Sequence, residues 1–199
     1  MLCSCLHHFG VPRSDEMAVF KGSIKENFEI RFFLTRSGAR KLLTKWKSEK
    51  RRLEPYSFVD HYFTRGESRA KVRRWRSAHT PKIEIIFFKR RAGVKTESSK
   101  AATSPQTASR ELEALGFKPY LKIVKDRAWL VTKKGLLTHA VEFVPGLGWT
   151  GEIEVPVKDR KKIPSHMVHL KQMGVTRITR KSMLQLMEER LEGKQVPAG

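Results

Sequence analysis

The sequence predicts an α+β protein built on a closed antiparallel β-barrel with helices packed against its outside. Several segments alternate apolar and charged residues with a period of two, which is the pattern of strands with one apolar and one polar face. Other segments carry apolar residues three and four apart, which is typical of amphipathic helices. A sheet with one wet face would explain any single strand, but charged rows on four strands together with these helices favour a barrel with a charged interior.

The first half of the chain is predicted to form a strand, a helix and three further strands. Residues 27–34 alternate strictly, and residues 37–47 have helical spacing with Ser37 as a candidate cap. Three more strands are predicted for "YSFVDHYF", "RAKVRRW" and "KIEIIFF", the first two around the turn "TRGES". Residues 92–108 are rich in Ser, Thr, Ala and Lys, so we expect a mobile connection between two halves of one domain.

The second half is predicted to contain a short helix, three strands and two final helices. Gly116 closes the helix over residues 109–115, and the last two helical segments are also followed by glycine. The predicted strands cover residues 118–132, 136–144 and 150–157, and the final helices cover residues 166–173 and 181–192.

Composition indicates a globular protein with anionic partners. The chain has 199 residues, of which 39% are hydrophobic and 31% charged, and no apolar run approaches the length of a membrane span. Lys and Arg number 41 against 20 Asp and Glu, a net charge of +21 that favours nucleic acid, nucleotides or polyphosphates as partners. We expect no membrane partner.

The N-terminal segment is expected to be a disordered leader over residues 1–24, and Met17 is as plausible a start as Met1. Cys3 and Cys5 are the only cysteines, which fits a reducing compartment and a cytoplasmic protein. "CSCLHH" combines thiols with imidazoles, but no second half-site with zinc-ligand spacing follows. The predicted domain covers residues 25–193, and residues 194–199 form a tail.

Two carboxylates side by side on one strand raise a specific question. Glu152 and Glu154 share one face of their predicted strand, and Ile153 lies on the other. Like charges at this spacing repel, so the face is either solvated or lines a cavity in which a cation offsets the repulsion. Further period-two rows are Asn27, Glu29 and Arg31, then Lys71 and Arg73, then Lys125 and Arg127.

From about Asn27 to Leu191 the chain resembles the CYTH domain, the family of class IV adenylyl cyclases and thiamine triphosphatases among the triphosphate tunnel metalloenzymes. The most specific part is "LEALGFKPYLKIVKDRAWLV" followed by "VEFVPGLGWTGEIEV". "DHYF", "KVRR" and "SMLQLMEERL" are similar to the remaining landmarks of the family. The family's N-terminal signature is ExExK, and the matching positions here are Asn27, Glu29 and Arg31.

The resemblance implies a tunnel in which carboxylates hold a divalent metal and bases bind a triphosphate. By this resemblance the catalytic, metal-binding residues are Glu29, Glu152 and Glu154, with Glu142 as a further ligand, and the metal is Mg²⁺ or Mn²⁺. The implied phosphate-binding residues are Arg31, Lys71, Arg73, Lys89, Lys125 and Arg127. Lys89 falls on the parity of Ile85 and Phe87, so it needs a bulge or a strand end to enter the tunnel.

Two functions remain open on the sequence. The first is a metal-dependent enzyme acting on a triphosphate or nucleotide by hydrolysis or cyclisation, and hydrolysis is favoured because no adenine pocket is recognisable. The alternative is a CYTH-like barrel that binds RNA or polyphosphate on its basic surface, with Trp46 and Trp75 as possible stacking partners. The surface bases that suggest the alternative are Arg51, Arg52, Arg65, Arg69, Arg74, Arg76, Arg90 and Arg91.

Overall fold

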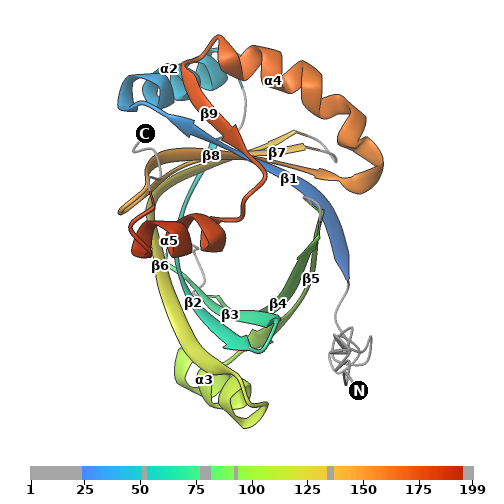
Figure 1. Ribbon diagram of the computed structural model, residues 1–199. Helices are drawn as coiled ribbons and strands as arrows, with labels where there is room; N and C mark the ends of the chain where they lie inside the picture. The colour runs from blue at the N-terminus through green and yellow to red at the C-terminus, as the bar shows by residue number, and fades with distance from the viewer. Residues whose placement is uncertain (1–23, 51–52, 77–81, 92–93, 134–136, 195–199) are drawn as a thin grey trace, which may run out of the picture.

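The computed structural model describes residues 24–50, 53–76, 82–91, 94–133 and 137–194, and within them the chain forms a closed antiparallel β-barrel (Figure 1). This confirms the predicted fold class. The strands are β1 (Lys25–Leu34), β2 (Leu53–Arg65), β3 (Ser68–Trp75), β4 (Ile83–Arg91), β5 (Val94–Ala102), β6 (Lys118–Lys133), β7 (Leu137–Val144), β8 (Gly148–Pro156) and β9 (Val175–Thr179). The helices are α2 (Arg36–Ser48), α3 (Pro105–Ala114), the 3-10 helix η1 (Val157–Lys162), α4 (Ile163–Lys171) and α5 (Met183–Leu191).

Strand β1 closes the barrel. The hydrogen-bonded order is β5-β4-β3-β2-β6-β7-β8-β1-β9, with an additional pairing between β5 and β1. The outer edge of β1 is divided, because residues 25–28 pair with β5 and residues 31–34 pair with β9. Strands β1 to β8 therefore form the ring, and β9 lies outside it.

One helical layer covers the outer face of β1, β7 and β8 (Figure 1). Helix α2 begins after Thr35, whose hydroxyl accepts a hydrogen bond from the backbone N–H of Gly38 at 3.0 Å. The expected cap at Ser37 is thus wrong by two residues. The buried cluster beneath the layer contains Ile30, Phe32, Leu34, Ala39, Leu42, Trp46, Val141, Ile153, Val155, Ile163 and Leu170.

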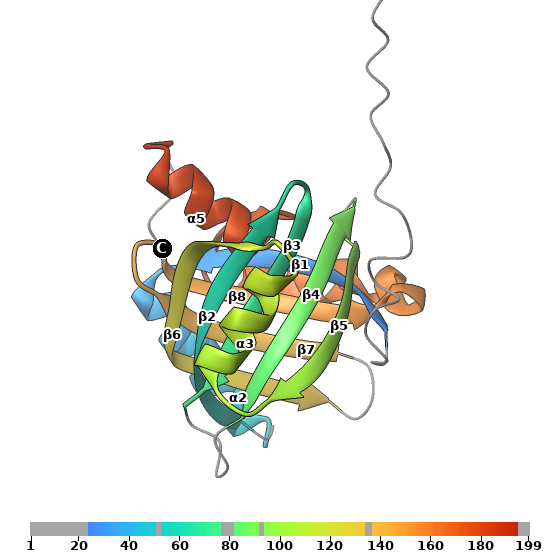
Figure 2. The same cartoon turned by 90° about the horizontal axis from the view of Figure 1, so that it is seen from below.

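Helix α3 covers the opposite side of the barrel, across β3 and its neighbours (Figure 2). Ala108 and Leu112 of this helix pack against Phe63, Val72 and Ile85 from the strands. Because alternate residues point outward from each strand, these contacts cover the apolar outer face and leave the charged residues inside.

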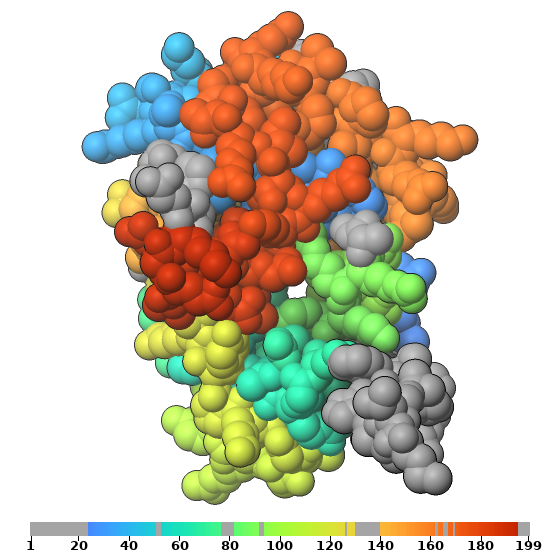
Figure 3. Space-filling view, viewed as in Figure 1, coloured from blue at the N-terminus to red at the C-terminus, as the bar shows by residue number. Residues whose placement is uncertain are grey.

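Helix α5 covers part of one end of the barrel. Its capping box joins Ser182 and Gln185, which fixes the start of the helix. Met183, Leu184 and Leu186 are buried against lumen-facing apolar side chains, namely Phe33, Tyr62 and Ile123. Figure 3 shows an opening on this face beside α5, between the segment that follows β9 and strands β3 to β5.

The expected mobile connection over residues 92–108 is wrong. Residues 94–102 form β5, which pairs with β4 along its length, and α3 begins at Pro105 with Ser104 as its cap. A strand with small and polar residues can be part of a barrel because pairing on both edges supplies its backbone hydrogen bonds. Strand β9 was not predicted. The proposed leader and its "CSCLHH" stretch, apart from Ile24, lie outside the described residues, as do residues 195–199 of the tail.

Among the described residues, no helix is both long and apolar enough to cross a membrane.

Candidate functional site

The lumen is lined by charged side chains that the strand register brings face to face. On β1 and β8, Glu29 lies opposite Glu154 and Arg31 opposite Glu152. Between β2 and β3, Asp60 lies opposite Arg73. Glu29, Arg31 and Asp60 are almost completely buried, so electrostatic interactions among these side chains are stronger than they would be in water.

Gly151 explains how β8 can approach β1 at this point. It pairs with Phe32 across the two strands, and a Cβ on Gly151 would lie 2.1 Å from the Phe32 ring. The ring therefore occupies the outer face where a side chain would be. This contact holds the neighbouring Glu152 on the opposite, lumenal face.

The acidic wall, which we define as Glu29, Glu142, Glu152 and Glu154, is organised by a single guanidinium. Arg31 Nη1 donates to Glu142 Oε1 at 2.8 Å, and Nη2 donates to Glu29 Oε1 at 2.8 Å. Nη2 also donates to Glu152 Oε2. Arg31 is only 3% exposed, so this cation is buried among three carboxylates.

Three further bases surround the acidic wall. Lys125 Nζ contacts Glu142 Oε2 at 2.6 Å, and Arg90 Nη1 contacts Glu29 Oε1 at 3.0 Å. Lys95 Nζ contacts Glu154 Oε1 at 3.1 Å. Burial alone would raise the pKa of Glu29, but Arg31, Lys95 and Arg90 outweigh it and hold that pKa far below its usual value.

Glu152 is the least compensated member of the acidic wall. Burial raises the pKa of Glu152, and repulsion from Glu29 and Glu154 adds to this, beyond what the attraction of Arg31 offsets. Glu154 accepts a hydrogen bond from Asn27 Nδ2 at 2.7 Å in addition to its contact with Lys95. The pair of carboxylates is thus held by Arg31, Lys95 and Asn27.

The basic wall, which we define as Lys71, Arg73 and their partner Asp60, has the inverse composition. Arg73 Nε and Nη2 donate to the two oxygens of Asp60 at 2.7 Å each, and Lys71 Nζ donates to Asp60 Oδ2 at 3.0 Å. The Arg73 guanidinium also lies 3.8 Å from the centre of the Phe58 ring. Burial and the neighbouring Arg73 lower the pKa of Lys71 to about 8.

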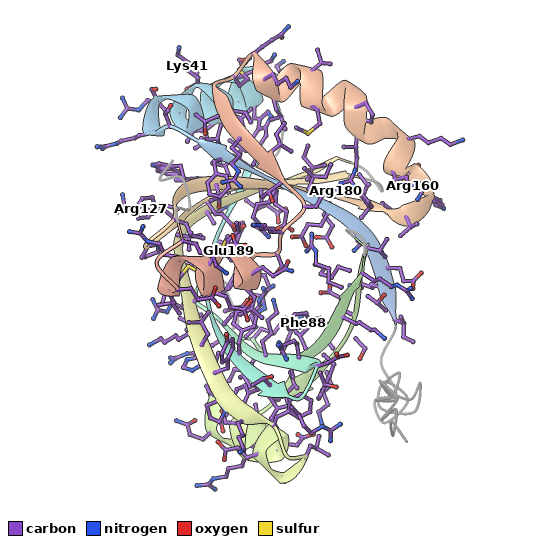
Figure 4. All side chains as sticks on the ribbon, in the orientation of Figure 1. Lys41, Phe88, Arg127, Arg160, Arg180 and Glu189 are labelled. Atoms are coloured by element: carbon purple, nitrogen blue, oxygen red, sulfur yellow. The ribbon has the colours of Figure 1, made fainter. Side chains whose placement is uncertain are left out.

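Arg127 lies outside the lumen, and its predicted position is wrong. Tyr56 pairs with Ala128 and Phe58 with Lys125, so two residues of β6 lie opposite Ser57 in a β-bulge. The bulge reverses the parity of the strand after Lys125. Arg127 is exposed, its guanidinium lies 5.1 Å from the centre of the Phe143 ring, and Figure 4 shows it at the outer side of the barrel.

Lys89 also lies outside the lumen. Strand β4 pairs with β5 without a register shift from Ile83 to Arg91, so there is no bulge to turn Lys89 inward. Lys89 is exposed, while its neighbours Phe88 and Arg90 lie on the lumenal face; Figure 4 shows Phe88 in the space that the strands enclose. Arg90 takes the place that was expected for Lys89.

Several lumenal residues were missed at the sequence level. Lys95 and Glu97 lie in the segment that was expected to be a mobile connection, and they contact each other at 3.4 Å. Asp60 had a signal, because it lies in the "DHYF" stretch, alternates with the apolar Val59 and shares one face of the predicted strand with Tyr62. Tyr56, whose hydroxyl donates to Glu142 at 3.0 Å, had none.

No protein-family profile matches the chain, and no curated protein matches it. Solved structures do match. The PH1819 protein of Pyrococcus horikoshii OT3 superposes with a TM-score of 0.67 at 20% identity, over 82% of this chain and 99% of that one. A candidate adenylate cyclase of Vibrio parahaemolyticus has a TM-score of 0.62 at 13% identity, over 82% and 98% of the two chains.

A third match is HpAC1 of Hippeastrum, a candidate adenylyl cyclase with a dominant triphosphatase activity. Its TM-score is 0.59 at 13% identity, and the match covers 87% of this chain and 98% of that one. The chain has the triphosphate-tunnel fold of the CYTH type. At these identities the likeness concerns the fold, and the roles of individual tunnel residues rest on their geometry.

The tunnel's acidic wall has the donor chemistry that a hard divalent cation requires. Glu29, Glu152 and Glu154 offer carboxylate oxygens from two adjacent strands. Burial and the repulsion from Glu29 raise the pKa of Glu152, so a further cation would stabilise its charged form. Within the described ranges, however, no three acidic, His or Cys side chains are already arranged to hold a metal. We attribute this to Arg31, whose guanidinium lies among the carboxylates.

Proposed function

We propose that the chain is an enzyme that acts on a triphosphate-containing substrate inside the tunnel and hydrolyses its terminal phosphoryl group. The observation that carries this proposal is the pairing of an acidic and a basic wall across one buried lumen. A triphosphate needs cationic donors for its oxygens, and a divalent metal, Mg²⁺ or Mn²⁺ in this proposal, needs carboxylates.

The basic wall would bind the phosphates. Lys71 and Arg73 share one carboxylate, so each retains donors that can turn to a polyanion. Lys125 on β6, Arg31 on β1 and Arg90 on β4 would also bind phosphate oxygens. Because solvent is largely excluded, each charge-assisted hydrogen bond would be stronger than at the surface.

The acidic wall would hold the cation through Glu29, Glu152 and Glu154, with Glu142 beside them. A bound divalent ion supplies electrostatic stabilisation of the phosphate charge and lowers the pKa of water. In hydrolysis a water oxygen would form a bond to the terminal phosphorus while the bridging P–O bond breaks. The leaving diphosphate would take the electron pair of that bond, together with the proton that the water loses. Similarity of fold to HpAC1, which has a dominant triphosphatase activity, favours hydrolysis over cyclisation.

The decisive experiment removes charge from β8 without changing size. In the double variant Glu152→Gln, Glu154→Gln, Mn²⁺-dependent release of phosphate from tripolyphosphate should fall to background. Metal-free binding of tripolyphosphate should persist or tighten, because two charges that repel the polyanion are gone. Glu113→Gln, on an exposed position of α3, is the matched control.

Two outcomes would contradict the proposal. One is a double variant that retains full Mn²⁺-dependent turnover. The other is a wild-type protein with no turnover of tripolyphosphate, thiamine triphosphate or ATP at any Mg²⁺ or Mn²⁺ concentration. In the second case Asn27→Glu tests whether the missing charge on β1 is the cause, since Asn27 lies beside Glu154.

A second candidate function is binding of RNA or another polyanion on the outer surface. Six lumenal bases of the described residues are each paired with a lumenal acid, namely Arg31, Lys71, Arg73, Arg90, Lys95 and Lys125. The excess of positive charge therefore lies mainly outside the tunnel. Trp46 is buried in the core, whereas Trp75 is half-buried and contacts the Phe58 ring edge-to-face with 5.2 Å between the ring centres. Exposed bases of the helical layer, of β9 and of the residue that follows β9 include Arg36, Arg40, Lys41, Arg160, Arg177 and Arg180, of which Figure 4 labels three.

The outer surface can be tested apart from the tunnel. Charge reversal at Arg36 and Arg40 should weaken binding of single-stranded RNA and reduce its salt dependence, while tripolyphosphate turnover stays unchanged. RNA affinity that does not change in this variant would remove the helical layer from consideration.

A further inference from the structure

We propose that the Arg31 guanidinium occupies the cation position of the acidic wall, so that Arg31 and a divalent metal compete for the same carboxylates. This inference rests on the proposed function. It adds an order of events, in which a triphosphate draws Arg31 away from the wall and the metal then enters.

The contacts of Arg31 distinguish it from the other lumenal bases. It bridges three of the four carboxylates from three different strands, Glu29 on β1, Glu142 on β7 and Glu152 on β8. Among the described residues, Lys95 contacts two members of the wall, Glu29 at 3.6 Å and Glu154 at 3.1 Å. Lys125 and Arg90 each form a side-chain ion pair with one member. Arg31 is therefore at the point where the carboxylates converge.

The chemistry of the side chain explains why an arginine can hold this position. A guanidinium presents several donors in a planar fork, whereas a lysine ammonium is a compact point charge. The two terminal nitrogens of Arg31 are used by carboxylates, while its buried Nε has no hydrogen-bond partner among the described residues. Arg31 thus still has a donor available for a phosphate oxygen.

A divalent ion cannot simply join this arrangement. Placed among the same three carboxylates, it would lie within a few ångströms of a buried positive charge, and like charges repel strongly where solvent is excluded. Arg31 in turn cannot leave its partners without another anion, because a buried unpaired charge is unfavourable. A triphosphate supplies that anion. We therefore expect weak metal binding by the substrate-free protein.

The test is calorimetric titration of Mn²⁺ into the substrate-free full-length protein at neutral pH. Arg31→Met should bind one Mn²⁺ ion, and the wild type should show no saturable binding over the same concentrations. The affinity of Arg31→Met for Mn²⁺ should therefore be at least tenfold higher than that of the wild type, a difference within the usual range for coupled sites. Adding Glu152→Gln to Arg31→Met should abolish the gained site. Arg127→Met, which removes an exposed arginine of β6, should behave as wild type.

The inference would be overturned if the wild type bound Mn²⁺ saturably and as tightly as Arg31→Met does, and if Glu152→Gln abolished that binding. It would also be overturned by a folded Arg31→Met that gains no affinity. If Arg31→Met does not fold, as judged by circular dichroism, Arg31→Lys replaces it. A point charge cannot span three carboxylates, so this variant should also gain Mn²⁺ affinity, and no gain would equally contradict the inference.

A parallel titration separates this inference from the proposed function. Tripolyphosphate is added to the wild-type protein without metal. Absence of binding would contradict the proposed function, whatever Mn²⁺ does. If tripolyphosphate binds and Arg31→Met gains no Mn²⁺ site, only the competition is wrong.

Discussion

The two walls of the tunnel are built on inverse charge patterns. On the acidic wall one arginine, Arg31, holds three carboxylates, and on the basic wall one carboxylate, Asp60, holds Lys71 and Arg73. In both, a single residue of the minority sign lies at the centre and is almost completely buried. The acidic wall would therefore accept a cation and the basic wall an anion. In the absence of a ligand, both walls are stabilised by a central side chain of the opposite charge.

This comparison shows how a chain can keep like charges close together in a buried space. Several carboxylates or several bases alone would repel one another and shift their pKa values until they lost charge. A central counter-ion from the chain prevents this, and Asp60 keeps a pKa far below its usual value because Arg73 and Lys71 outweigh the effect of burial. Under the proposed function, a ligand of the same sign would take the place of this counter-ion.

The largest expected effect follows from removing the central cation of the acidic wall. Arg31→Met should lower the free energy of unfolding by about 3–5 kcal/mol, because it leaves buried carboxylates without their partner. Urea denaturation measures this, with Arg40→Met at an exposed position of α2 as the control. A loss below about 1 kcal/mol, the value typical of surface ion pairs, would show that Arg31 is not the central counter-ion.

Two bases of the same strand test whether the lumen alone binds phosphate. Lys125→Met should weaken metal-free tripolyphosphate binding by about 10–100-fold, the value of one or two charge-assisted hydrogen bonds. Arg127→Met should leave the affinity unchanged, because the bulge in β6 turns that side chain outward. Calorimetry on both variants gives the comparison. Equal losses would mean that phosphate is not bound through the lumenal face of β6.

The difference between Lys125 and Arg127 also marks what sequence can and cannot predict here. Strict alternation correctly separates the two faces of β1, β3 and β8, because a period of two follows from strand geometry. The bulge in β6 adds one residue and so reverses which of the following residues face the lumen. The sequence "KDRAW" contains no recognisable signal for this bulge. The rule then places Arg127 in the lumen, although it lies outside.

Composition misled the prediction in a second place. Residues 94–102 are mostly small, polar and charged, so they were expected to form a connection. They form β5, and Lys95 of this strand contacts Glu154 of the acidic wall. Strand pairing with β4 and β1 outweighed local propensity, which is weak in strands. The central role of Arg31 also needed coordinates, because its three partners come from three strands.

Removing the central anion of the basic wall should sharpen the comparison in the opposite direction. Asp60→Asn frees Lys71 and Arg73 from competition, so metal-free tripolyphosphate affinity should rise about tenfold even though the ligand-free protein is destabilised. The measurement is calorimetry at a temperature where circular dichroism shows a folded variant. Weaker binding by the folded variant would mean that Asp60 positions the two bases for phosphate, and does not merely neutralise them.

The smallest expected effect concerns the protonation of Lys71. Its pKa of about 8 lies below the usual 10.5, because burial and Arg73 disfavour the charged form. The protonated form binds a polyanion, so tripolyphosphate affinity should fall about fivefold between pH 7 and pH 9, as this group loses its proton. In Lys71→Arg the charge persists through this range. The pH dependence that remains in that variant belongs to the ligand and to other groups.

The same group should affect stability with the opposite sign. The unfolded chain keeps the Lys71 proton up to about pH 10.5 and the folded chain only to about pH 8. Between these values the unfolded state binds more protons, so the free energy of unfolding gains from this group as pH rises, relative to Lys71→Arg. Urea denaturation and tripolyphosphate calorimetry across pH 7–10 on both proteins measure the two effects. If affinity and stability changed in the same direction relative to Lys71→Arg, Lys71 would not be the base that the tunnel keeps poised for phosphate.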